Sequence, residues 1–215
     1  MRPRTDTLEF VSRVLTLGAY GLCAVVFLAA PVMALSWRQI PFPGFLVEST
    51  LVVNFRSSPG WSGSAAGIGA PDLVTRIAGL PVRTTSEYTA ALQAHRIGEK
   101  ISVFTVSQDG RPRLYPDIRL TSFSTQNMLE LFWLPYFVGL AYVLIGVWVF
   151  IARGRERPGR ALAFFCGAVA IVAALLFDVL TTHLATALWL AAVAMLGGSL
   201  LSLAMRFPVE WRPVH

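Results

Sequence analysis

The sequence predicts an α-helical membrane bundle of four transmembrane helices, with an extracytoplasmic α+β domain inserted between the first and second helices. Its 215 residues are 55% hydrophobic and 14% charged, whereas soluble domains carry roughly 25% charged residues. Four long apolar runs approach the ~20 residues that cross a bilayer. Between the first two runs, residues 38–128 instead combine proline, glycine and serine with short β-branched stretches, which indicates a folded domain outside the bilayer.

The four apolar runs predict transmembrane helices at residues 14–37, 129–152, 161–181 and 184–205. The first run has an alternative interpretation as a cleaved signal peptide, because "LAAPVMALS" within it is similar to a cleavage site. Its apolar part is longer than the roughly 7–15 residues usual in a signal peptide. We therefore interpret this run as a retained membrane anchor.

Arginines flank the apolar runs in a pattern that sets the orientation. They lie in residues 1–13, in the connection 153–160 ("RGRERPGR") and in the tail 206–215. Short loops rich in arginine and lysine remain in the cytoplasm, so we predict that these segments are cytoplasmic and that the 38–128 domain lies outside a bacterial inner membrane. The net charge of +6 is then expected to face membrane lipid, with no nucleic-acid partner.

Within residues 38–128, the pattern predicts strands around one helix. Thr84 and Thr85 can both cap this helix, with Glu87 three residues after Thr84 in a capping box. Asp109-Gly110 is a hairpin-turn signal, and Pro116 confines part of the strand after it to a sheet edge or a bulge. The expected elements are one or two strands at 45–55, a loop at 57–71, a strand pair at 72–82, a helix from 86 to about 95, a strand at 100–106 and a returning strand at 113–123.

The stretch "AAGIGAPDLVTRIAGLPVRTTSEYTAALQAHRIGEKISVFTVSQDG" resembles a bacterial, circularly permuted PDZ domain. The likeness covers about 80 residues, with Pro71-Asp72 and Ala78-Gly79 in place of the usual Gly-Asp and Asn-Gly. It implies a groove that binds an extended peptide as an added strand and holds its C-terminal carboxylate on backbone amides. The groove residues that the resemblance implies are Gly44, Phe45, Leu46, Thr85, Thr89 and Leu92. The plainer interpretation, which we favour, is that Phe45, Leu46 and Leu92 fill a small core.

Polar residues interrupt the apolar pattern in "LLFDVLTTHLATALWL", residues 175–190. An ionisable group inside a transmembrane span is a functional hypothesis by default, because its burial is costly. Near the end of a span, however, an acid can accept hydrogen bonds from the turn that follows. We therefore favour a polar cap of a helical hairpin, formed by Asp178, Thr181, Thr182 and His183, over ion or proton handling.

Sequence motifs of catalysis are missing from the chain. It contains no HExxH, no G-x-S-x-G, no CxxC and no phosphate-binding loop, and these patterns mark zinc, serine-nucleophile, redox and nucleotide chemistry. Cys23 and Cys166 both fall in predicted spans, where we expect them to pack as small apolar side chains. We predict a protein that is not an enzyme and that uses no cofactor or metal.

The motif Phe177-Asp178…Thr181-Thr182-His183…Leu188-Trp189 and the stretch "FVGLAYVLIGVWVFIARGRERPGRALAFF" are similar to the N-terminal membrane sensor region of bacterial PDZ-containing integral membrane signal-transduction histidine kinases. The resemblance implies a sensory input module that continues into a kinase in a longer protein. It implies a peptide or protein ligand and a homodimer or a larger membrane complex as partners. The alternatives are an assembly subunit of a membrane complex and an adaptor that presents substrates to a protease.

Overall fold

The structure, a computed structural model, describes residues 3–58 and 60–206. Arg2, Arg212 and residues 207–215 of the predicted tail lie outside the described residues. The described chain is mostly helical, with a small antiparallel sheet between the first helix and the later ones. The helices are α1 (Pro3–Trp37), α2 (Ser62–Ala65), α3 (Thr85–Gln93), α4 (Thr125–Met128), the π-helix η1 (Leu129–Trp133), α5 (Leu134–Arg153), α6 (Arg157–Ala174), α7 (Leu176–Leu180) and α8 (Thr186–Arg206). The strands are β1 (Leu73–Ile77), β2 (Leu80–Pro81), β3 (Lys100–Val106) and β4 (Pro112–Arg119).

Among the described residues, three helices are long and apolar enough to cross a membrane, at Val14–Trp37, Thr125–Arg153 and Thr186–Met205. They correspond to the first, second and fourth predicted spans, and they indicate a membrane protein. A shorter apolar helix covers Pro158–Ala174. The chain divides into two compact units. The bundle unit holds the chain up to Ala30, Trp133–Leu175 and the chain from Ala187 onward, and the sheet unit holds Pro31–Phe132 and Leu176–Thr186.

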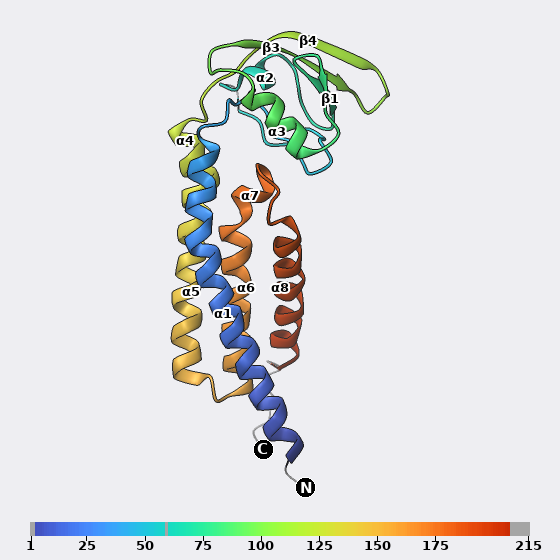
Figure 1. Ribbon diagram of the computed structural model, residues 1–215. Helices are drawn as coiled ribbons and strands as arrows, with labels where there is room; N and C mark the ends of the chain where they lie inside the picture. The colour runs from blue at the N-terminus through green and yellow to red at the C-terminus, as the bar shows by residue number, and fades with distance from the viewer. Residues whose placement is uncertain (1–2, 59, 207–215) are drawn as a thin grey trace, which may run out of the picture. The chain divides into compact units, whose positions relative to one another are not determined.

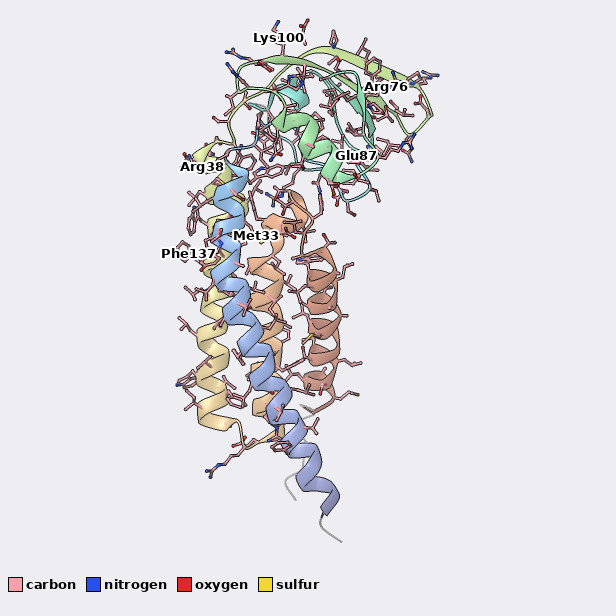
Figure 2. All side chains as sticks on the ribbon, viewed as in Figure 1. Met33, Arg38, Arg76, Glu87, Lys100 and Phe137 are labelled. Carbon is pink, nitrogen blue, oxygen red and sulfur yellow. The ribbon has the colours of Figure 1, made fainter. Side chains whose placement is uncertain are left out.

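Small residues and tyrosine hydroxyls join the helices of the bundle unit, which run alongside one another in Figure 1. The Tyr20 hydroxyl of α1 donates to the carbonyl of Ala163 in α6 at 2.7 Å. The Tyr136 hydroxyl of α5 donates to the carbonyl of Phe27 in α1 at 3.0 Å. Gly146 of α5 leaves the space that the Tyr20 ring occupies, as small residues do where membrane helices approach closely. By contrast, Phe137 points away from α5 (Figure 2).

The sheet unit contains a four-stranded antiparallel sheet in the order β2-β1-β3-β4, with α3 along one face (Figure 1). The predicted strand pair at 72–82 is confirmed, with Ala78 and Gly79 turning between β1 and β2 at φ 49° and 81°. Pro116 lies in the edge strand β4, beside a bulge where Ile101 pairs with Ile118 and Val103 with Tyr115, as expected for a residue without an N–H. Lys100 and Arg76 mark β3 and β1 in Figure 2.

Three predicted elements differ from the structure. The segment predicted as a loop at 57–71 contains the four-residue helix α2. Residues 45–55 form isolated bridges, Val47 to Val53 and Val52 to Leu73, rather than a regular strand. A tight turn interrupts them, because Leu51 adopts a left-handed φ of 64°. The helix expected at 161–181 is also interrupted, since α6 ends at Ala174 and the short helix α7 follows separately. Phe177 of α7 packs within the sheet unit against Phe123 and Phe132, and this packing accompanies the break.

Candidate functional site

The loop that the PDZ resemblance implies as the carboxylate site is tightly built. Gly44 adopts φ 80°, and its carbonyl accepts hydrogen bonds from the backbone N–H of Ser64 at 3.0 Å and from the Ser64 hydroxyl at 3.2 Å. A Cβ at Gly44 would lie 2.4 Å from the Ser62 nitrogen, a contact that no side chain can make. Only glycine therefore fits this position, on both steric and conformational grounds.

The backbone N–H groups of this loop are without partners. None of the hydrogen bonds among residues 3–58 and 60–206 uses the N–H of Gly44, Phe45 or Leu46, although all three residues are buried. Pro43 has no N–H, so the series of donors begins at Gly44. Successive backbone donors without a partner among the described residues can bind an acceptor such as a carboxylate.

Helix α3 lies beside this loop and presents a mixed face. Thr84 caps the helix through its side-chain oxygen, which accepts from the N–H of Glu87 at 3.2 Å. The Glu87 carboxylate in turn accepts from the N–H of Arg83 at 2.7 Å, one residue before the position that a capping box uses. Thr85 and Thr89 are half-buried, whereas Leu92 is fully buried.

Tyr88 connects α3 with the loop and was not identified from the sequence. Its ring centroid lies 6.4 Å from that of Phe45. Tyr88 occupies the same helix face as Thr85, Thr89 and Leu92 by its spacing, so the helical period was the signal that could have identified it. Burial raises the pKa of the Tyr88 phenol well above its ordinary value. The phenol therefore remains neutral in the folded sheet unit.

The Asp178 turn, defined here as residues 178–185, is held by the aspartate carboxylate. Asp178 is 5% exposed. Its Oδ1 accepts from the N–H of Leu184 at 3.2 Å and from the Thr182 hydroxyl, and its Oδ2 accepts from the N–H of Ala185 at 2.8 Å. These residues immediately precede α8, where backbone N–H groups lack intrahelical partners and an anion is favoured by the helix dipole.

Thr181 and His183 complete the turn. The Thr181 hydroxyl donates to the carbonyl of Phe177 at 2.6 Å, and the His183 carbonyl accepts from the Thr186 hydroxyl at 3.1 Å. His183 adopts a left-handed φ of 58°, a conformation uncommon outside glycine that histidine, asparagine and aspartate adopt more often than other residues.

The imidazole of His183 bonds to the bridged segment that follows the loop. Its Nε2 lies 2.9 Å from the carbonyl oxygen of Val47, and because a carbonyl only accepts, Nε2 is the donor. Val47 is 4% exposed. The bond occupies the Val47 carbonyl, which lies in the bridged segment 45–55. The two sites that the sequence predicts separately, the loop and the hairpin cap, therefore meet at Val47.

The sheet unit contains an aromatic cluster, which consists of Phe42, Trp61, Phe123, Phe132 and Phe177. Its members are buried, and Phe42 meets Trp61 and Phe123 edge to face at centroid distances of 5.0 and 5.1 Å. Phe177 meets Phe123 at 5.9 Å and Phe132 at 5.7 Å. Edge-to-face pairs of this kind contribute about 0.5–1.5 kcal/mol each beyond their buried area. The cluster joins α7 to the segments at both ends of the 38–128 domain.

No protein-family model matches this chain, and no curated protein matches it either.

Proposed function

We propose that the chain is a non-catalytic sensory input module of a bacterial inner membrane, in which a PDZ-like domain outside the cytoplasm binds the C-terminus of a peptide or protein. The observation that supports it most directly is the run of unpaired N–H groups at Gly44, Phe45 and Leu46 in a buried loop. A terminal carboxylate would accept from these donors, and charge-assisted bonds of this kind are stronger than neutral ones. In this proposal the module belongs to a histidine-kinase-type sensor.

The contact between His183 and Val47 supports a way to pass the signal on. The Asp178 turn lies in the connection between α6 and α8. The His183 imidazole of this turn binds the Val47 carbonyl, which in the proposal an added peptide strand also uses. In the proposal, a bound peptide displaces the imidazole and shifts the turn. The peptide then favours one of two arrangements of the helices, and it acts only through its unequal affinity for them.

Peptide titration of the full chain in lipid nanodiscs tests the binding. We expect peptides with a free C-terminus to bind saturably and the same peptides with an amidated C-terminus to bind at least tenfold more weakly, because the amide carries no charge. Gly44→Ala should abolish binding. Gly67→Ala is the matched control, since Gly67 also has a positive φ of 93° but open space around its Cβ position. Equal binding of free and amidated peptides would exclude the carboxylate site.

Cysteine labelling from each side of the membrane tests the four-span topology. Gln108, Arg155 and Leu184 are exposed, whereas the native Cys23 and Cys166 are buried. We expect Gln108→Cys and Leu184→Cys to react with an impermeant maleimide from the outside and Arg155→Cys from the cytoplasm. Reaction of Leu184→Cys from the cytoplasmic side would mean that α6 does not cross. Reaction of Arg155→Cys and Gln108→Cys from one side would exclude the sensor topology.

The second candidate is an assembly subunit of a larger membrane complex. Exposed apolar side chains on the sheet unit favour it, because Phe55 is 86% exposed, Leu80 55% and Leu114 53%. Side chains of this size tend to be covered when a partner binds. Co-purification of one stable partner that is lost in the Phe55→Ser variant would support assembly. Unchanged partner binding in that variant would count against it.

A further inference from the structure

A cavity in the sheet unit is lined by residues other than Gly44, Phe45 and Leu46 of the peptide loop. It has a volume of about 430 Å³ and lies between the loop that precedes α2 and the segment from Thr121 to η1. This volume is within the range of roughly 300–1,000 Å³ that small-molecule sites occupy. Hydroxyl and amide groups line it, including Ser122, Ser124 and Asn127. The cavity is therefore suited to a small polar molecule.

Trp61 forms part of the cavity wall. The residue is 7% exposed, and its indole N–H makes no hydrogen bond to any described residue. Its ring is fixed edge to face against Phe42, with centroids 5.0 Å apart. Because a buried donor without a partner costs about 1–3 kcal/mol, such groups are rare in folded proteins. The indole nitrogen itself has almost no accessible surface, so other atoms of the Trp61 ring form this part of the cavity wall.

Two opposite charges also line the cavity. The Arg56 guanidinium forms no ion pair with any described residue. The Glu130 carboxylate accepts from the Gln126 amide at 3.0 Å through Oε1, and Oε2 has no partner among the described residues. A ligand that carries one positive and one negative group would match both charges without adding net charge. This pattern favours a zwitterion over a phosphate or a simple cation.

Glu130 also lies in an unusual backbone segment. It belongs to η1, a π-helical turn that runs directly into α5. π-Helical turns are rare, and they occur frequently at functional sites. The adjacent Leu131 lines the same cavity. The backbone irregularity at the beginning of α5 thus coincides with the charged wall of the cavity.

We infer that this cavity binds a small zwitterionic amino compound, of the class of free amino acids and dipeptides. Its carboxylate pairs with Arg56, its ammonium group pairs with Glu130, and the Trp61 ring forms part of the wall. The inference goes beyond the proposed peptide site, since it uses different residues and a different ligand. A ligand here contacts η1, the segment that continues into the second membrane helix.

Calorimetric titration of the full chain in nanodiscs tests the inference, with individual amino acids and glycyl dipeptides as probes. We expect saturable binding of at least one probe. Its N-acetylated and C-amidated forms should bind at least tenfold more weakly, because each lacks one charge. Arg56→Gln and Glu130→Gln should each weaken binding by tenfold or more. Arg83→Gln and Asp117→Asn, which change exposed charges away from the cavity, should leave binding within twofold.

Arg56 and Glu130 are exposed, so we expect their variants to fold and a loss of binding to report on the cavity. Thermal unfolding of each variant checks this expectation. Absence of saturable binding by all probes to the folded wild-type chain would overturn the inference. So would binding that Arg56→Gln and Glu130→Gln leave unchanged, or equal binding of the blocked compounds. The amidated-peptide test of the loop at Gly44 is unaffected by any of these results.

Discussion

Two turns next to apolar helices each contain a buried charged side chain that binds backbone groups, and the two side chains have opposite charges. In the Arg160 turn, residues 154–160, the Arg160 guanidinium donates through Nη1 to the carbonyls of Gly154 at 3.1 Å and Arg155 at 2.9 Å. In the Asp178 turn, the carboxylate accepts from the N–H groups of Leu184 and Ala185. The carbonyls follow the end of α5 and the N–H groups precede α8, so each charge matches the free backbone groups and the dipole of the helix end beside it.

The two turns differ in what else they contact. The Arg160 turn carries a local ion pair, Arg153 to Glu156 at 3.8 Å, between exposed side chains. The Asp178 turn bonds through His183 to Val47, which lies 136 residues earlier. A local ion pair of this kind acts between residues of the turn and of the helix end beside it. A turn that also binds a remote segment can respond to what happens there, and this is the physical basis of the proposed signalling.

The largest expected effect is on the Asp178 turn. Asp178→Ala leaves two backbone N–H groups and the Thr182 hydroxyl without their acceptor, and we expect a loss of about 3 kcal/mol in the free energy of unfolding. Asp178→Asn, which keeps one oxygen, should lose less. Unfolding in mixed micelles with increasing dodecyl sulfate measures both. Asp117→Asn, at an exposed position on β4, is the control. A loss below 0.5 kcal/mol, on the order of a surface change, would show that the carboxylate does not hold the turn.

The Arg160 turn should respond to a smaller degree. Arg160 is 4% exposed, and Arg160→Ala removes a charged donor from two carbonyls that can still reach water at the turn. We expect a loss of about 2 kcal/mol, against less than about 0.5 kcal/mol for the exposed Arg155→Ala. Arg160→Lys should recover only part of the loss, because an ammonium group lacks the planar fork of donors. Equal losses of stability in Arg155→Ala and Arg160→Ala would show that the Arg160 guanidinium does not hold its turn.

The sequence predicts those helices and turns that are determined by residues close to one another in the chain. The apolar runs locate three of the membrane-length helices, and Ala78-Gly79 and Thr84 locate the β1–β2 turn and the beginning of α3. The break after Ala174 has no local signal, because apolar residues continue through Phe177. It coincides with the packing of Phe177 against Phe123 and Phe132, which are distant in the sequence.

The site residues follow the same rule: those with a local signal were predicted, and those that depend on distant partners were not. Asp178, Thr181, Thr182 and His183 were recognised because a polar group at the end of an apolar run is unusual. The bond from His183 to Val47 was not predicted, because nothing in either segment specifies its partner. Trp61 and Arg56 were overlooked for the same reason, since only the fold brings them to one cavity with Glu130. Long-range pairing, rather than residue type, was the missing information.

Removing the His183 bond tests the remote contact that distinguishes the Asp178 turn. His183→Asn keeps a residue that tolerates a left-handed φ but is too short to reach the Val47 carbonyl. We expect a loss of about 1 kcal/mol, seen as about fivefold faster hydrogen exchange at the amides of Glu48 and Asn54, which bond across the bridged segment. Ala78→Asn, at another left-handed position, should leave these amides unchanged. Unaltered exchange in His183→Asn would reduce the Asp178 turn to a local cap like the Arg160 turn.

The smallest expected effect is a pH dependence confined to the unit that carries the Asp178 turn. Burial raises the pKa of Tyr88 above its ordinary value, whereas an unfolded chain releases this proton near pH 10. The stabilisation from the neutral phenol is therefore complete below pH 10 and is lost as the pH rises, by about 0.8 kcal/mol at pH 10.5. Tyr88→Phe should remove this part of the decline. Between pH 8 and 10.5, amide exchange in the Asp178 turn should accelerate in the wild type more than in Tyr88→Phe, while the Arg160 turn shows no such difference. If both turns respond alike to Tyr88→Phe, the two units unfold as one, and the contrast between a local turn and a coupled turn does not hold.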